Sequence, residues 1–247
     1  MDIKRGILFE KSIPFHIISR AVEGRKIFAE EDDICRFIFQ MYVANIGKPA
    51  FNLRRQDIIK AAHAILNGEE IPKRLIIVEH QPLVYNLSFS LVVNHDHEIL
   101  VQNVEGGIPK YLQKRNNGFA KYYNLKHGRK ANLFERPYKI IPIQTNFQLD
   151  AVLRYVNVKN PLDVYQPNWT KEGLKNQAGA LEFLNKYQFS SFPDLFKERN
   201  SKILAPRNEL EKFLGEEIIK NKEEYLKFIE DYLEKKLISF TPLFLEE

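Results

Sequence analysis

Hydrophobic positions near the N-terminus follow a short strand pattern and then a longer helical one. Residues 15–19 (FHIIS) form an apolar, β-branched run that ends before a turn-like Glu-Gly-Arg sequence, which predicts a strand. Asp32 and Asp33 follow, and after them apolar side chains recur at helical spacing: Ile34, Phe37, Ile38, Met41 and Tyr42. Acidic residues at the start of such a pattern favour a helix N-terminus. We therefore expect a strand and then an amphipathic helix.

The middle of the chain repeats both patterns. Residues 47–82 are rich in Lys, Gly and Pro around one predicted helix at 55–66, and we interpret them as an insertion. The elements predicted after it are strands at 83–93 and 98–102, a helix at 106–128, a strand at 138–143 and a helix at 147–158. This order predicts an α/β (α+β) sandwich in which helices pack on an antiparallel sheet.

The pattern changes after Pro161. Residues 162–169, which follow Pro161 and contain Pro167, read as an irregular connection. Residues 173–187 and 208–236 have helical spacing. Residues 201–247 carry 8 Lys/Arg and 11 Asp/Glu, so this end of the chain is acidic. We predict a main domain over residues 1–161, followed over residues 162–247 by the connection and an acidic helical tail.

Composition limits the class of protein. Hydrophobic residues make up 44% and charged residues 28% of the 247 residues, which excludes a wholly disordered or fibrous chain. Cys35 is the only cysteine, so an internal disulfide and a zinc cluster built from cysteines are both excluded. No stretch reaches the roughly 20 apolar residues of a membrane span, and the N-terminus lacks the apolar core of a signal peptide. We expect a cytoplasmic protein with no membrane partner.

Positive charge is concentrated in one part of the chain. The formal net charge is +5, yet residues 110–139 alone contain nine Lys or Arg side chains and one acid, Glu135. Aromatic residues are interleaved with them: Tyr111, Phe119, Tyr122, Tyr123, Phe134 and Tyr138. Basic side chains neutralise phosphates and aromatic faces stack on unpaired bases, which favours a nucleic-acid surface. A solvated helix with a basic outer face explains the charge equally well.

Two histidines have a distinctive spacing. His95 and His97 lie two residues apart directly after a strand-like run, so on an extended chain both imidazoles point to the same face. Asp96 then faces the other way. Two imidazoles on one face can begin a metal site, although they do not complete one. The alternative interpretation is a strand end that carries two surface histidines.

Several motifs occur together in one order, and their combination resembles a known family. They are His16-x-x-x-Arg20, Asn94-His95-Asp96-His97, Gly106-Gly107-Ile108 before Tyr111-Leu112-Gln113-Lys114, the run 119–123, the run 133–139, Arg154-Tyr155-Val156 with Asn160-Pro161, and Ser190-Ser191-Phe192 after Tyr187. Together they resemble the single-tyrosine transposases of the HUH superfamily, in the branch associated with repetitive extragenic palindromes (REP). The resemblance spans residues 14–200.

The resemblance implies an RRM-like or ferredoxin-like fold and an enzyme that cleaves and rejoins single-stranded DNA. It assigns Tyr155 as the nucleophile, which would form a 5′-phosphotyrosine link, and His95 and His97 as ligands of Mg²⁺ or Mn²⁺. A phenol is a poor nucleophile at neutral pH, which is why this chemistry needs a metal at the scissile phosphate. A third metal ligand is expected from the helix that carries Tyr155.

Two positions depart from the family pattern. The residue between the histidines is usually bulky and apolar, and here it is Asp96, which must be exposed, paired or part of the metal site because burying an unpaired carboxylate is costly. Four residues after the tyrosine the family usually has an amide, and here that position is Lys159, which cannot bind a metal. Asn160 can replace it if the helix loosens before Pro161; Asn157 is the other nearby amide.

The expected partner is single-stranded or hairpin DNA. We predict that its phosphates contact basic side chains before and within the basic window: Arg20, Arg25, Lys114, Arg115, Lys121, Arg129 and Lys130. A homodimer and a monomer are both compatible with the sequence. Two other hypotheses stay open, namely a DNA-binding protein on the same scaffold that no longer cuts, and an unrelated α/β domain with a basic helix.

Overall fold

Four antiparallel strands form the central sheet, in the order β4-β5-β1-β6. This computed structural model describes residues 12–195, 198–215 and 223. The strands are β1 (Pro14–Arg20), β4 (Val84–Val92), β5 (His95–Gln102) and β6 (Lys139–Pro142). The predicted strands at 15–19, 83–93 and 138–143 are confirmed. The strand predicted at 98–102 begins earlier, because Val93 and Asn94 form a two-residue turn that returns the chain directly into β5.

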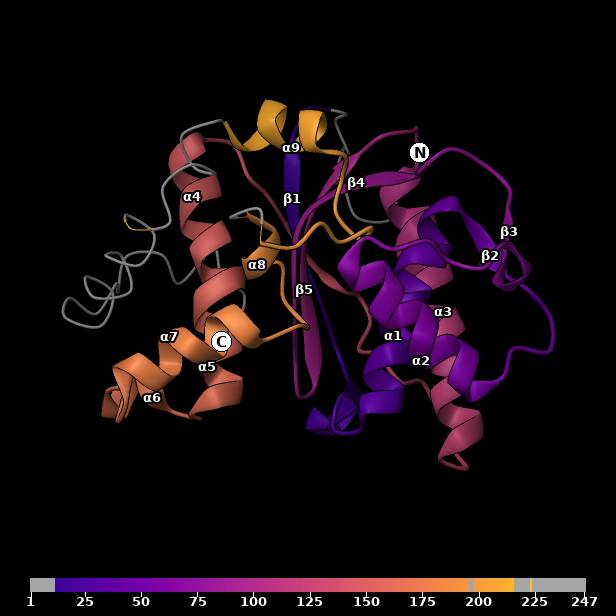
Figure 1. Ribbon diagram of the computed structural model, residues 1–247, viewed down its shortest axis with the longest axis horizontal. Helices are drawn as coiled ribbons and strands as arrows, with labels where there is room; N and C mark the ends of the chain where they lie inside the picture. Colours follow the sequence, from indigo (N-terminus) through magenta and orange to yellow (C-terminus); the bar gives the residue numbers. More distant parts are fainter. Residues whose placement is uncertain (1–11, 196–197, 216–222, 224–247) are drawn as a thin grey trace.

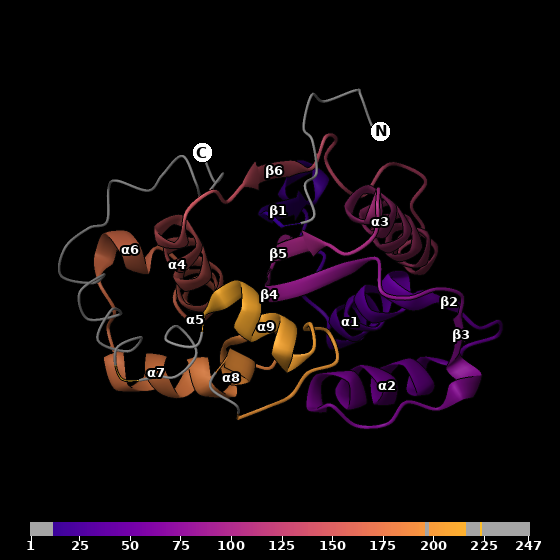
Figure 2. The ribbon, with the colours of Figure 1, turned by 90° about the horizontal axis from the view of Figure 1, so that it is seen from above.

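Helices cover both faces of the sheet (Figure 1). One face carries α1 (Glu31–Ile46) and α3 (Gly107–Lys126), and the other carries α4 (Asn146–Arg154), the π-helix η4 (Tyr155–Lys159) and α5 (Asn160–Tyr165). Figure 2 shows the sheet between these two layers. Because both faces are covered, every residue of β5 is buried, polar ones included. The predicted α+β sandwich is confirmed.

Residues 47–82 form a small unit of their own beside α1. They contain β2 (Gly47–Pro49), α2 (Arg55–Asn67), the short 3₁₀ helix η3 (Lys73–Leu75) and β3 (Ile76–Val78), and β2 pairs with β3. The helix α2 matches the one predicted at 55–66, and it lies against α1 on the side away from the sheet (Figure 2). Ile58, Ala62 and Ile65 are buried in this contact and join the main hydrophobic core.

The chain after α5 packs partly on α5 and partly on the sheet. It forms α6 (Trp169–Glu172), α7 (Gln177–Lys186), α8 (Phe192–Leu195) and α9 (Arg207–Leu214). The helix predicted from residue 173 begins only at Gln177, because Gly173 has a φ of 78° and the Asn176 side chain caps the new helix. Residues 189–191 pair with the outer edge of β4 through two backbone hydrogen bonds, Leu91 N to Phe189 O and Ser191 N to Phe89 O. Most of the helix predicted at 208–236 lies outside the described residues.

The long helix α3 begins where the chain approaches β4 closely. Gly106 has a φ of 65°, a left-handed conformation that glycine adopts without strain. A side chain at Gly107 would collide with the carbonyl oxygen of Leu83. This pair of glycines therefore seats α3 tightly against the sheet. Among the residues that the structure describes, no helix is long and apolar enough to cross a membrane.

Candidate metal and nucleophile site

His95 and His97 project from the same face of β5, as their spacing predicts. They pair across the sheet with Arg20 and Ile18 of β1, and their ring centroids lie 4.8 Å apart. His97 is fully buried and His95 is 7% exposed, so these are not the solvated histidines of the alternative interpretation. The face on which they lie is the one covered by α4, η4 and α5.

Each imidazole is held through its Nδ1 atom. His97 Nδ1 lies 3.0 Å from Nε2 of His16 in β1, and His95 Nδ1 lies 2.6 Å from Oδ1 of Asn94 in the turn. In the tautomers in which both Nδ1 atoms donate, both Nε2 atoms carry the lone pair that a metal requires. The sequence motifs contain His16 and Asn94 but do not reveal this role. A histidine inside the apolar run 15–19 is the signal that could have indicated it.

Tyr155 packs directly against these histidines. Its ring centroid lies 5.5 Å from that of His97 and 6.1 Å from that of His16, both in edge-on arrangements. The side chain is 4% exposed. Lys159 places its Nζ atom 3.5 Å from the Tyr155 hydroxyl oxygen and 2.8 Å from a carboxylate oxygen of Asp163. The predicted nucleophile and the predicted metal ligands are thus brought together, with an ammonium group beside the hydroxyl.

The helix changes type at Tyr155. The predicted helix at 147–158 is α-helical only to Arg154 and then continues as a π-helix, in which the backbone N–H of Asn160 donates to the carbonyl of Tyr155. A π turn contains one residue more than an α turn, so the residue five positions after the tyrosine comes round toward its face. The helix therefore loosens before Pro161, as expected, and it does so by forming a π turn that holds one extra residue.

Asn160 is buried without hydrogen bonds. Its side chain is fully buried, and neither its amide nitrogen nor its oxygen has a hydrogen-bond partner within the described part of the chain. Such a group loses its hydration on folding and gains nothing in return, which costs about 1–3 kcal/mol. Buried polar groups of this kind indicate a ligand, a water molecule or strain.

The other nearby amide, Asn157, is fully engaged. Its nitrogen donates to Ser88 Oγ and to the carbonyl of Leu153, both at 2.8 Å, and its oxygen accepts a 2.6 Å hydrogen bond from Ser191. These contacts join η4 to β4 and to the segment 189–191. Asn157 therefore has a structural role, and Asn160 is left as the available amide.

Asp96 faces the opposite side of the sheet, as predicted, and there it is paired. Its Oδ2 atom lies 2.7 Å from Nη1 of Arg115, which also forms an ion pair with Glu98. Arg115 donates a further hydrogen bond of 2.6 Å to Ser19. All three charged side chains are fully buried. Burial raises the pKa of Asp96 to about 6, and the nearby guanidinium acts against this shift.

Arg115 is therefore not a DNA contact, and the prediction that it binds phosphates is wrong. Charge along the sequence does not distinguish a solvated arginine from one that points inward, and on α3 the two differ only in helical phase. Its neighbour Lys114 is directed to Glu79 and His80, with Nζ 3.0 Å from His80 Nε2. Arg25 lies 3.4 Å from Glu23, and Arg129 is half-buried just after α3.

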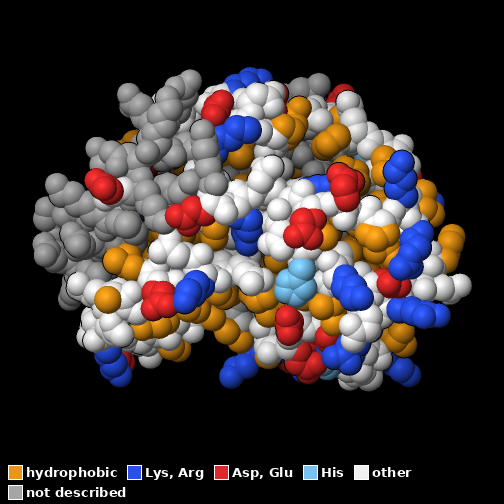
Figure 3. Space-filling view, viewed as in Figure 1, with side chains coloured by type: hydrophobic (Ala, Val, Ile, Leu, Met, Phe, Trp, Pro, Cys, Tyr) orange, Lys and Arg blue, Asp and Glu red, His pale blue; other side chains and the backbone are white. Residues whose placement is uncertain are grey.

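Two of the predicted DNA contacts, Lys121 and Lys130, line a groove of about 850 Å³ between α3 and the loop at 130–138. Lys110 and Arg136 also line this groove. Glu135 is the one acidic residue in its lining. Amides (Gln113, Asn116, Asn117, Asn124 and Asn132) and two aromatic rings (Phe134 and Tyr138) complete its polar and stacking surface. On the face seen in Figure 3, by contrast, Lys and Arg are interspersed with Asp and Glu.

The wall of the groove is bonded to the end of the strand that pairs with His95. Its loop is bonded to the end of β1, where Val22 N donates to Leu133 O and Glu135 N donates to Arg20 O. The same end of β1 is bonded to the turn before His95, through Ala21 N and Asn94 O at 2.9 Å. Arg20 thus lies between the groove wall and His95, on the histidine face of the sheet.

Comparisons with known proteins give a structural likeness and no sequence match. No protein-family profile matches the chain, and no curated protein sequence matches it. Among solved structures, the structure of a REP-associated tyrosine transposase bound to a REP hairpin is similar, with a TM-score of 0.41 and 14% sequence identity. The alignment covers 83% of this chain and 92% of that chain.

Proposed function

We propose that this chain is a DNA transferase of the transposase type, which binds single-stranded or hairpin DNA and cuts and rejoins it through Tyr155. The observation that carries the proposal is the packing of Tyr155 against two same-face histidines that are held through Nδ1. Asn160, a buried amide without hydrogen-bond partners within the described part of the chain, follows five residues later in the same helical segment. The test is a covalent protein–DNA adduct that forms with Mn²⁺ and depends on Tyr155.

The donor set fits a divalent metal. His95 and His97 would supply two imidazole nitrogens and Asn160 an amide oxygen, and the unpaired state of that amide supports its role as the third ligand. Imidazole nitrogens suit transition ions and amide oxygens suit harder ions, so this mixed set favours Mn²⁺ over Mg²⁺. When bound, the metal would polarise the scissile phosphate and offset charge on the leaving oxygen.

The chain's own residues would carry the bond exchange. The Tyr155 oxygen attacks the phosphorus; a tyrosyl O–P bond forms as the P–O3′ bond breaks, and the leaving 3′ oxygen takes up a proton. The phenol proton is lost to solvent, and the Lys159 ammonium, 3.5 Å from the hydroxyl, stabilises the resulting negative charge. Arg20 would orient the phosphate from the strand beside His95. Rejoining is the same exchange in reverse.

The groove along α3 would hold the DNA strand before it reaches the site. Lysines neutralise phosphates, and Phe134 and Tyr138 offer faces for unpaired bases. Because the groove wall is bonded to Arg20–Val22, a strand lying in it can pass to the histidines around the end of β1.

Affinity for single-stranded DNA should fall with salt, by about 0.7 log units per log unit of salt for each phosphate contacted. Replacing Lys121 and Lys130 together with Ala should reduce this slope by about 1.4, because two contacts are lost. Lys114→Ala is the matched control and should leave the slope unchanged, since Lys114 is directed to Glu79 and His80. Fluorescence anisotropy at several salt concentrations measures the DNA affinity and its salt slope for each protein. Equal slopes in all three proteins would remove the groove from the binding surface.

The Asn160→Leu variant should be more stable than the native protein and bind Mn²⁺ at least about tenfold more weakly. Leucine has nearly the same shape as asparagine and removes the buried, unpaired amide, so metal-free unfolding should cost about 1–3 kcal/mol more. Asn157→Leu is the control, because every polar atom of that side chain is bonded, and it should instead lose stability. Unchanged Mn²⁺ affinity in Asn160→Leu would exclude Asn160 as a ligand.

A second candidate function is a DNA-binding protein on the same scaffold that does not cut. The observation in its favour is that Tyr155 is only 4% exposed, so it also serves as a packing residue between the sheet and α4. Both candidate functions would use the same groove, and their affinity for DNA would depend on salt in the same way. Only the covalent adduct distinguishes them.

A further inference from the structure

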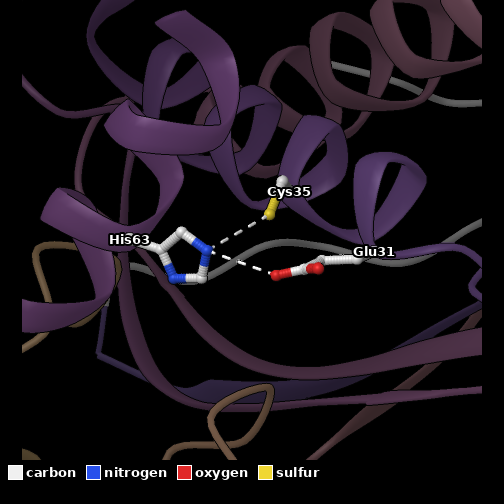
Figure 4. A group of neighbouring side chains, drawn as sticks. All are labelled: Glu31, Cys35 and His63. Atoms are coloured by element: carbon white, nitrogen blue, oxygen red, sulfur yellow. Dashed lines mark hydrogen bonds and ion pairs between the residues drawn. The ribbon is translucent and has the colours of Figure 1, made fainter. Parts of the chain in front are cut away.

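Three potential metal ligands meet between α1 and α2, on the side of the molecule away from the histidine pair. Glu31 and Cys35 lie one turn apart on α1, and His63 lies on α2 (Figure 4). His63 Nε2 is 3.5 Å from Glu31 Oε1 and 4.0 Å from Cys35 Sγ. All three ligand atoms lie within 4.8 Å of one another.

The geometry does not suit a nucleophilic cysteine. A relay of the protease kind needs the thiol and the carboxylate on opposite nitrogens of the imidazole, whereas here both face Nε2. Burial, together with the nearby carboxylates of Glu31 and Asp32, raises the pKa of the Cys35 thiol to about 12. A free thiol in this environment is protonated and unreactive. Instead, the ligand atoms of Glu31, Cys35 and His63 converge on a common point.

We propose that Glu31, Cys35 and His63 form a binding site for a divalent transition metal of the zinc class. One sulfur, one nitrogen and one carboxylate oxygen make a borderline-soft donor set. His63 Nε2 lies 3.5 Å and 4.0 Å from the other two ligand atoms, so small side-chain movements would bring all three to about 2.0–2.3 Å from a tetrahedral ion. Binding replaces the thiol proton, which passes to solvent. Glu31 is largely exposed, so water can complete the fourth position.

A second cluster of carboxylates and a histidine shows how a metal site differs from a group of charges that a lysine already neutralises. Glu30, Asp33 and His127 also lie within reach of one another. Lys126, however, already occupies their centre, with Nζ 2.7 Å from both Glu30 Oε2 and Asp33 Oδ1. A resident ammonium satisfies these carboxylates and leaves no place for a cation. No lysine or arginine is paired to Glu31, Cys35 or His63 among the described residues.

The site would join two parts of the chain. His63 belongs to the 47–82 unit and the other two ligands belong to α1 of the main sandwich. These two helices already share an apolar contact, and a metal would add a link at its solvent-facing margin. The expected consequence is a metal-dependent increase in the stability of α2 against α1.

Cobalt titration of the purified, reduced protein tests the proposal without DNA. Co²⁺ bound to a thiolate gives a near-ultraviolet charge-transfer band, and with Cys35 as the sole cysteine such a band identifies its ligand unambiguously. We expect one Co²⁺ per chain with this band, displaced by Zn²⁺. Absence of the band in the native protein at saturating Co²⁺ would overturn the proposal.

Variants separate the three ligands. Cys35→Ser should lose the band, whereas Glu31→Gln and His63→Gln should keep it with affinities at least about tenfold lower. His80→Gln, at a half-buried histidine outside the cluster, should match the native protein. Zinc at 100 times its dissociation constant should raise the melting temperature of the native protein by about 5–10 °C, and by less in Glu31→Gln. Equal Co²⁺ affinity in the native, Glu31→Gln and His63→Gln proteins would refute the three-ligand site even if Cys35→Ser failed to fold.

Discussion

The Tyr155→Phe variant should bind a single-stranded hairpin as tightly as the native protein and form no covalent adduct with it. The substitution removes one oxygen and keeps the ring, so the packing of residue 155 on His97 and His16 is preserved. Attack on phosphorus has no nucleophile in this variant, and adduct formation should fall by at least about 1000-fold, to the limit of detection. A denaturing gel with labelled DNA and Mn²⁺ measures the adduct.

Two controls make this result interpretable. Tyr165→Phe changes another tyrosine of the same helical segment, away from the histidines, and should leave the adduct yield unchanged. Omission of the divalent ion should abolish the adduct in the native protein. A native protein that binds hairpin DNA tightly with Mn²⁺ present, yet yields no adduct across several hairpins, would refute cleavage and leave the non-cutting DNA-binding function.

The Arg115→Met variant should be strongly destabilised. Methionine fills much of the same volume but leaves Asp96 and Glu98 buried without a cation, and breaking a buried ion pair in this way costs about 3–5 kcal/mol. For a chain of this size the melting temperature should fall by roughly 10 °C. Chemical denaturation followed by circular dichroism gives the free energy of unfolding directly.

Lys121→Met is the matched control on the same helix. Lys121 is exposed, so its replacement should change the free energy of unfolding by no more than about 0.5 kcal/mol. If Arg115→Met proved as stable as Lys121→Met, the ion pairs with Asp96 and Glu98 would not be buried in solution as they are in the structure.

The alternation of side chains along a strand predicted, from sequence alone, which face of the sheet each residue at the start of β5 occupies. Neighbouring strand residues face opposite sides, so His95 and His97 share one face and Asp96 takes the other. The partners on each face were not predictable in the same way. Arg115 and His16 are far from β5 in sequence, and only the antiparallel register and the phase of α3 bring them to it.

Two further features, the position of Asn160 and the cluster of Glu31, Cys35 and His63, could not be predicted because they depend on local backbone geometry and helix packing. Pro161 indicated that the helix after Tyr155 would loosen, but not that it would gain one residue as a π turn and so present Asn160. The cluster of Glu31, Cys35 and His63 needs α2 to lie against α1 in one phase. Helical periodicity predicts that α2 is amphipathic, yet it does not say which helix receives its apolar face.

The pairing of residues 189–191 with β4 has a consequence for assembly. An exposed strand edge is a template on which another chain can add a strand, and here one edge of the sheet is already occupied by the chain itself. The opposite edge is β6, a four-residue strand that contains Pro142 and begins with Lys139. Two copies that extended their sheets into each other would have to meet at β6, which follows directly after the loop at 130–138. Such a dimer would set its two grooves side by side, whereas a dimer formed through other surfaces would leave them apart.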